Sequence, residues 1–118
     1  MTASMTLDTC EAGLLALTCQ SGYSIVTQDM FFGRNSLVVC PHENANTTDC
    51  EASEALGVVR EHCDGRQECY VSAQHIVLGD PCPGVAKHAS VQYACHSKYC
   101  IGLVSGYKIN LTILSVVP

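Results

Sequence analysis

Nine cysteines in 118 residues constrain this chain more than any other feature of its sequence. They stand at positions 10, 19, 40, 50, 63, 69, 82, 95 and 100. No Cys-x-x-Cys pair occurs, and the five histidines show no zinc-finger spacing relative to the cysteines, so a metal framework is disfavoured. The cysteine density therefore predicts disulfides and a secreted or extracellular location. Because nine is odd, at least one thiol is free or pairs between chains.

Length and charge narrow the class of protein further. A chain of 118 residues with 47% hydrophobic residues fits one globular domain. The net charge of −5 and six scattered lysines and arginines argue against nucleic acid and against an anionic membrane surface. The apolar tail 101–118 is broken by polar residues and lysine, so we expect no membrane insertion.

Short apolar and alternating runs predict mainly β-strands. Strands are expected over the following ranges: 14–19, 23–26, 37–40, 69–71, 89–95 and 107–114. The first two are expected to be joined by a tight turn. The main helix is expected over 51–62, capped by Asp49, with a short helix over 72–79. These elements predict a compact, β-rich α+β fold of antiparallel strands, one main helix, one short helix and long ordered loops.

We divide the chain into three parts. Residues 1–8 have no apolar signal-peptide region and are expected to be a flexible segment. Residues 9–96 hold the domain, and residues 97–118 form an extension that we expect to add a β-strand. The sequons at Asn46 and Asn110 are candidate glycosylation sites, which agrees with secretion.

No residue pattern predicts catalysis, a metal or a cofactor. Glu51, Glu54 and Glu61 lie on the expected surface helix, where such carboxylates are most often solvated. A nucleophilic cysteine needs a free thiol beside a base, and most thiols here are expected to be bridged. Four other residues match no tetrahedral zinc spacing that we can defend: Cys82, His88, Cys95 and His96. We therefore expect neither an enzyme nor an inhibitor.

The stretch "VLGDPCPGVAKH", residues 77–88, concentrates two prolines and two glycines around Asp80 and Lys87. One interpretation is a stiff connector whose charges face water. In the other, Asp80, Lys87 and Glu11 form a rigid frame for a neutral polyol, whose hydroxyls accept and donate charge-assisted hydrogen bonds. These residues alone leave both interpretations open.

The order of short motifs resembles the sea-urchin-egg-lectin-type domain, a family of galactose- and rhamnose-binding lectins also found at the N-terminus of latrophilin-type receptors. The motifs run from Cys10 to Cys95: CEAG, FFGR, TTDC, REHCDGRQECYV, GDPCPGVAK and VQYAC. Each motif alone is weak evidence. Six in order, with eight cysteines in family positions, form a specific signal.

The resemblance implies a set of disulfides: Cys10–Cys40, Cys19–Cys95, Cys50–Cys82 and Cys63–Cys69. It leaves Cys100 unpaired, which makes this residue a candidate for a covalent homodimer; a buried thiol is the alternative. It also implies that Glu11, Asp80 and Lys87 hydrogen-bond to sugar hydroxyls.

Several positions depart from the family pattern. Phe32 replaces a tyrosine, and we expect its ring to stack on a sugar face while Arg34 supports the site. His75 stands where the family often has asparagine, and we expect it to be a further ligand-binding residue. "GVAKH", residues 84–88, replaces Gly-Thr-Tyr-Lys-Tyr, so we expect Val85, Ala86 and His88 to set which sugar fits.

The expected function is a non-catalytic carbohydrate-binding module for terminal L-rhamnose or galactose-type sugars. Monovalent affinity is expected to be weak, because a shallow site makes few bonds to a monosaccharide. The alternative is an extracellular protein–protein adhesion module that keeps the lectin fold, has little sugar affinity and binds a cell-surface protein. The replaced residues around the polar triad favour this alternative.

Overall fold

The computed structural model describes residues 4–97, 101–104 and 107–110. The elements in chain order are β1 (Ser4–Cys10), β2 (Leu14–Thr18), β3 (Tyr23–Arg34), β4 (Cys50–Glu51), α1 (Ala55–Cys63), β5 (Glu68–Ser72), α2 (His75–Leu78), β6 (His88–Ser97), β7 (Ile101–Val104) and β8 (Tyr107–Asn110). Over these residues the fold is strand-rich α+β with antiparallel sheets, two helices and four disulfides. The expected fold class is therefore confirmed.

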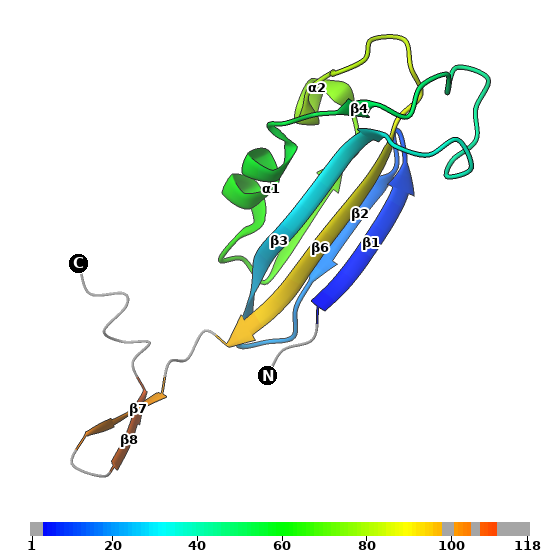
Figure 1. The fold of residues 1–118 in the computed structure, drawn as a ribbon. Helices are drawn as coiled ribbons and strands as arrows, with labels where there is room; N and C mark the ends of the chain where they lie inside the picture. Colours follow the sequence, from blue (N-terminus) through cyan, green and yellow to red (C-terminus); the bar gives the residue numbers. More distant parts are fainter. Residues whose placement is uncertain (1–3, 98–100, 105–106, 111–118) are drawn as a thin grey trace.

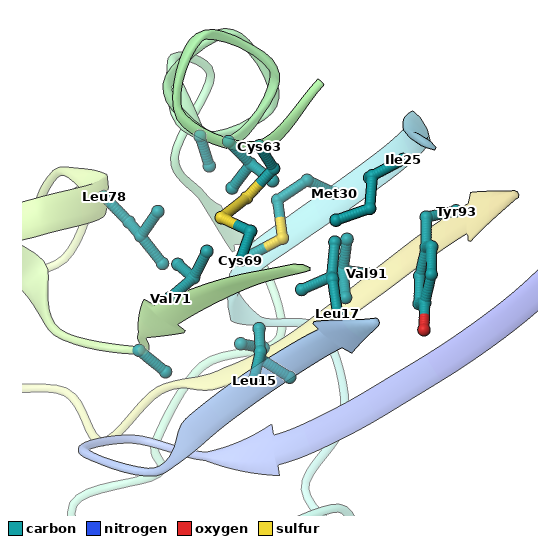
Figure 2. Close-up of a cluster of buried hydrophobic side chains, with 14 of the residues drawn as sticks. Leu15, Leu17, Ile25, Met30, Cys63, Cys69, Val71, Leu78, Val91 and Tyr93 are labelled. Carbon is teal, nitrogen blue, oxygen red and sulfur yellow. A yellow bond between two sulfur atoms is a disulfide. The ribbon is translucent and has the colours of Figure 1, made fainter. Parts of the chain in front are cut away.

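The core lies between two sheets. A four-stranded sheet in the order β1-β6-β3-β4 faces the two-stranded sheet β2-β5. In β2, every second residue is buried, so Leu15 and Leu17 point into the core while their neighbours are exposed. Figure 2 shows these two leucines beneath Val91 of β6, with the Cys63–Cys69 disulfide joining α1 to β5. The alternation thus fixes which face of each strand packs and where α1 is attached.

The pairing of β3 with β6 runs almost the length of the domain. It extends from Tyr23 opposite Ser97 to Gly33 opposite His88, with a bulge between Thr27 and Asp29. Gly33 has a φ of +156°, and a Cβ there would lie 2.0 Å from the carbonyl oxygen of Cys50. Glycine is therefore required for β4 to approach β3 at this end of the sheet.

Four disulfides fasten the loops to the sheets, and they join the pairs that the resemblance implies. The bridges are Cys10–Cys40, Cys19–Cys95, Cys50–Cys82 and Cys63–Cys69. Two of them, Cys10–Cys40 and Cys50–Cys82, hold the loop after β3 and the loop before β6. Both loops lie at the upper end of the sheet in Figure 1.

Three of the expected elements differ from the structure. Residues 37–40 form no strand, because Arg34 binds the carbonyl groups of Val39 and Cys40 that a strand partner would need. The main helix begins at Ala55 instead of residue 51, since Cys50–Glu51 pairs with β3, and Glu54 rather than Asp49 is its N-cap. The short helix covers His75–Leu78 rather than 72–79, because Ser72 is the last residue of β5. Strands β2 and β3 are joined by a turn, as expected.

The ends of the chain also differ from the prediction. Residues 4–8 are not a loose segment, because Ser4–Cys10 pairs with β6 over its whole length. In the extension, β7 and β8 pair with each other rather than adding one strand to the main sheet. Cys100 and residues 111–114 lie outside the described residues. Within the described part, no helix combines the length and hydropathy needed to cross a bilayer.

Candidate functional site

Three strand ends meet at one end of the main sheet. Cys10 of β1 and Gly33 of β3 both lie opposite His88, the first residue of β6. Glu11, Arg34 and Lys87 stand next to these three residues in the chain, so the sheet register brings them together. Figure 1 shows the long loops gathered at the same end.

The acid and base singled out in the sequence form an ion pair. Lys87 Nζ lies 3.0 Å from Asp80 Oδ1 and donates a hydrogen bond of 2.9 Å to the carbonyl oxygen of Val85. The Lys87 side chain is 3% exposed and that of Asp80 is 28% exposed, so the carboxylate can be reached from solvent while the whole lysine side chain is largely covered. The hydrogen bond from Lys87 lowers the pKa of the Asp80 carboxyl.

Glu11 joins this pair through the backbone. The Lys87 amide donates to Glu11 Oε1 at 2.9 Å, and the Glu11 amide donates to the Lys87 carbonyl oxygen at 3.0 Å. His75, the first residue of α2, places its Nδ1 4.0 Å from Glu11 Oε2 and is half exposed. The fold thus brings together four predicted residues that are up to 76 positions apart.

These four side chains line one hollow of about 310 Å³, which we call the triad hollow. Val85 and Ala86 form part of its wall. A larger hollow of about 400 Å³ also touches Asp80, but neither Glu11 nor Lys87 lines it. The triad hollow is therefore the candidate site, because Glu11, Asp80 and Lys87 all line it.

The buried Arg34 side chain holds together the loops that form the triad hollow. Its wholly buried guanidinium donates to the carbonyl oxygens of Ala86 at 2.9 Å and Ser36 at 2.8 Å. It also donates to the carbonyls of Val39 and Cys40. One side chain therefore ties the loop before Lys87 to the loop after β3.

Phe32 does not take part in the site. Its side chain is wholly buried in the core and lines neither hollow that contains Glu11 and Lys87. The expectation that this ring stacks on a sugar is wrong, because Phe32 shares with Met30 the face of β3 that packs inward. An aromatic residue next to a site in sequence can point into the core when strand alternation turns it away.

His88 also lies outside the triad hollow, contrary to the expectation that it selects the sugar. It is 5% exposed, and its ring centroid lies 5.1 Å from that of Phe31. Burial lowers the pKa of His88, the Arg34 guanidinium lowers it further, and Asp8 opposes the shift. His88 is thus a neutral packing residue behind the site.

We expect the free energy of unfolding to fall as pH drops through about 6.5, the usual pKa of histidine. The unfolded chain then takes up a proton that buried His88 resists, so acid favours unfolding. Urea denaturation between pH 7.5 and 5.5 measures this, with His88→Gln expected to show a smaller slope and exposed His62→Gln an unchanged one. Equal slopes for all three proteins would contradict this role of His88.

His42 and Asn44 line the triad hollow but were not predicted. The Ala86 amide donates to the Asn44 carbonyl oxygen at 3.1 Å, which holds their loop against the 84–88 segment. The only sequence signal was indirect: a Cys10–Cys40 bridge brings the residues after Cys40 close to Glu11.

The fold and the hollow together define a class: small disulfide-stapled binding domains whose site is built on loops at one end of a β-sheet. The family model of the D-galactoside/L-rhamnose binding SUEL lectin domain matches residues 17–95. The chain belongs to this family, as its motifs suggested.

Three relatives illustrate the family. A D-galactoside-specific lectin of Heliocidaris crassispina is 39% identical over 89 residues, covering 73% of this chain and 85% of that protein. An L-rhamnose-binding lectin of Echinometra lucunter is 39% identical over 88 residues, with the same shares covered. Latrophilin Cirl of Drosophila mojavensis is 33% identical over 90 residues, which are 75% of this chain and 5% of that much longer protein.

Proposed function

We propose that this chain is a non-catalytic, extracellular carbohydrate-binding module for terminal L-rhamnose or galactose-type sugars. The observation that carries the proposal is the triad hollow, in which Glu11, Asp80 and Lys87 face one space. Membership of a galactoside- and rhamnose-binding lectin family supports it. Four disulfides support an oxidising, extracellular setting.

The donors and acceptors suit adjacent hydroxyl groups on a sugar ring. Lys87 Nζ has two acceptors among the described residues, Asp80 and Val85, so one of its three hydrogens remains for a ligand hydroxyl. The partly exposed carboxylates of Asp80 and Glu11 accept hydrogen bonds from hydroxyls. Because the ion pair and the loop are already ordered, binding costs little conformational entropy.

A second candidate function is protein–protein adhesion, and one observation favours it. Three consecutive apolar residues on the loop after β3 are exposed: Leu37 at 54%, Val38 at 84% and Val39 at 42%. An exposed apolar group of this kind is typical of a protein contact. The Phe32 replacement no longer supports adhesion, because that residue lies in the core.

A titration separates the two functions. The domain is titrated with L-rhamnose and with D-galactose while the backbone amide chemical shifts are recorded. We expect saturable shift changes around Glu11, Asp80 and Lys87, with a Kd of about a millimolar or weaker. Asp80→Ala and Lys87→Ala are expected to weaken binding at least tenfold, since each removes a charge-assisted hydrogen bond. Lys87→Met is a companion variant that keeps the packing of the covered lysine stem.

Asp49→Ala, which removes an exposed carboxylate away from the triad hollow, is the control and should bind as the unchanged protein does. Absence of any shift at tens of millimolar of either sugar rules out the sugar site and leaves adhesion. Equal weakening by Asp49→Ala would show a non-specific charge effect.

Covalent dimerisation through Cys100 and glycans on Asn46 and Asn110 remain predictions. A non-reducing gel tests the first: a dimer band that disappears in Cys100→Ser supports it. A monomer whose thiol reacts with a thiol probe contradicts it.

A further inference from the structure

A second hollow of about 340 Å³ adjoins the triad hollow. The two share four lining residues: Glu11, His42, Ala86 and Lys87. Because these four residues line both spaces, the two hollows lie side by side, within reach of a ligand longer than one sugar ring. We call the second space the adjacent hollow.

The lining of the adjacent hollow differs in chemistry from that of the triad hollow. Where the triad hollow has Asp80 and His75, the adjacent hollow has Pro41 and the Cys10–Cys40 disulfide. These are apolar, conformationally fixed groups. Such a wall suits the C–H face of a sugar ring rather than its hydroxyl edge.

His42 lies where the two hollows meet and can contribute a polar contact. Its Nδ1 accepts a hydrogen bond of 2.9 Å from the Asn44 amide, so in the neutral ring the hydrogen is on Nε2. His42 therefore offers one donor beside the apolar surface of Pro41 and the Cys10–Cys40 disulfide. A ring oxygen or a bridging glycosidic oxygen is the matching acceptor.

The wall is rigid. The disulfide fixes Cys40, and the buried Arg34 guanidinium holds the carbonyls of Val39 and Cys40 just before Pro41. The Ala86 amide is bonded to Asn44 on the other side. A surface that is ordered before the ligand arrives loses little entropy on binding, so even modest apolar contact adds affinity.

We propose that the adjacent hollow is a second subsite, which takes the sugar unit bonded to the terminal sugar held in the triad hollow. The proposal rests on the proposed sugar-binding function and extends it from a monosaccharide to an oligosaccharide ligand. Pro41 and the Cys10–Cys40 bridge contact the apolar face of the second ring.

The test compares methyl and phenyl glycosides of L-rhamnose and D-galactose, each in both anomeric forms, by calorimetry and amide shifts. The phenyl ring stands in for the apolar face of a second sugar. We expect one phenyl glycoside to bind three- to tenfold more tightly than its methyl counterpart, because it buries apolar surface against Pro41. It should also shift the amides of Cys10, Cys40 and His42 beyond the changes that the methyl glycoside causes.

Pro41→Ala is expected to reduce the phenyl advantage at least twofold and to leave the methyl glycoside unaffected. Pro83→Ala is the matched control, since Pro83 is an exposed proline that lines neither of the two hollows. Should Pro41→Ala fail to fold, the amide shifts of the unchanged protein decide the question.

The outcomes separate the two claims. Methyl glycosides that bind with no gain from the phenyl group would overturn the subsite and leave the sugar site intact. A phenyl gain that shifts amides only outside the adjacent hollow would also overturn it. Binding of no glycoside at all would overturn both the subsite and the proposed function.

Discussion

Arg34→Met is expected to lower the free energy of unfolding by about 3 kcal/mol or more and to abolish sugar binding. Arg34 is wholly buried and donates to four backbone carbonyls, two of them at Val39 and Cys40. Methionine fills similar space but leaves these buried acceptors without a donor. The loops that wall both hollows then lose their common anchor. Urea denaturation and the sugar titration measure the two effects.

Arg60→Met is the matched control. Arg60 is exposed; its Nε donates a bond of 3.2 Å to the Thr27 carbonyl oxygen and its Nη2 a long bond of 3.5 Å to that of Gln28. We expect a loss of about 1 kcal/mol and unchanged sugar affinity. An Arg34→Met protein as stable as Arg60→Met would contradict the anchoring role of Arg34.

Phe32→Ala is expected to destabilise the domain by about 3–5 kcal/mol, the usual cost of removing a fully buried aromatic side chain. The ring is 0% exposed in the core, and the truncation would leave a cavity between the sheets. Thermal denaturation followed by circular dichroism measures the loss.

Phe32→Leu distinguishes a core role from a sugar-stacking role. It keeps most of the apolar volume, so the domain should remain folded with a smaller loss of stability. Because the ring does not line the triad hollow, we expect sugar affinity within about twofold of the unchanged protein. A folded Phe32→Leu variant that binds sugar tenfold more weakly would show that Phe32 contributes to the sugar site.

The triad hollow was partly accessible to sequence reasoning. The rigid segment around Asp80 and Lys87 indicated a constrained site, and the family motifs connected it to Glu11. The structure places all three residues together. It also shows that the Lys87 side chain is covered and forms an ion pair with Asp80, which the sequence did not reveal. Exposure depends on neighbouring loops, and these come from remote parts of the chain.

The local sequence pattern predicted the wrong secondary structure where hydrogen bonds to remote parts of the chain were decisive. Residues 37–40 have an apolar, strand-like composition, but the buried guanidinium of Arg34 takes up their carbonyls. Residues 4–8 carry little pattern of their own, yet β6 offers them a free edge to pair with. In both cases the deciding hydrogen-bond partner lies outside the segment.

The sequence by itself determined the class of this protein: its cysteines, its alternating strands and the order of its motifs specify a disulfide-stapled, β-rich lectin-family domain. Those properties are local or repeat in a fixed order, so they can be recognised without coordinates. The tertiary structure decided which side chains line the two hollows. Strand alternation turned Phe32 inward, sheet register placed Glu11 against Lys87, and the Cys10–Cys40 bridge brought Pro41 and His42 to the site.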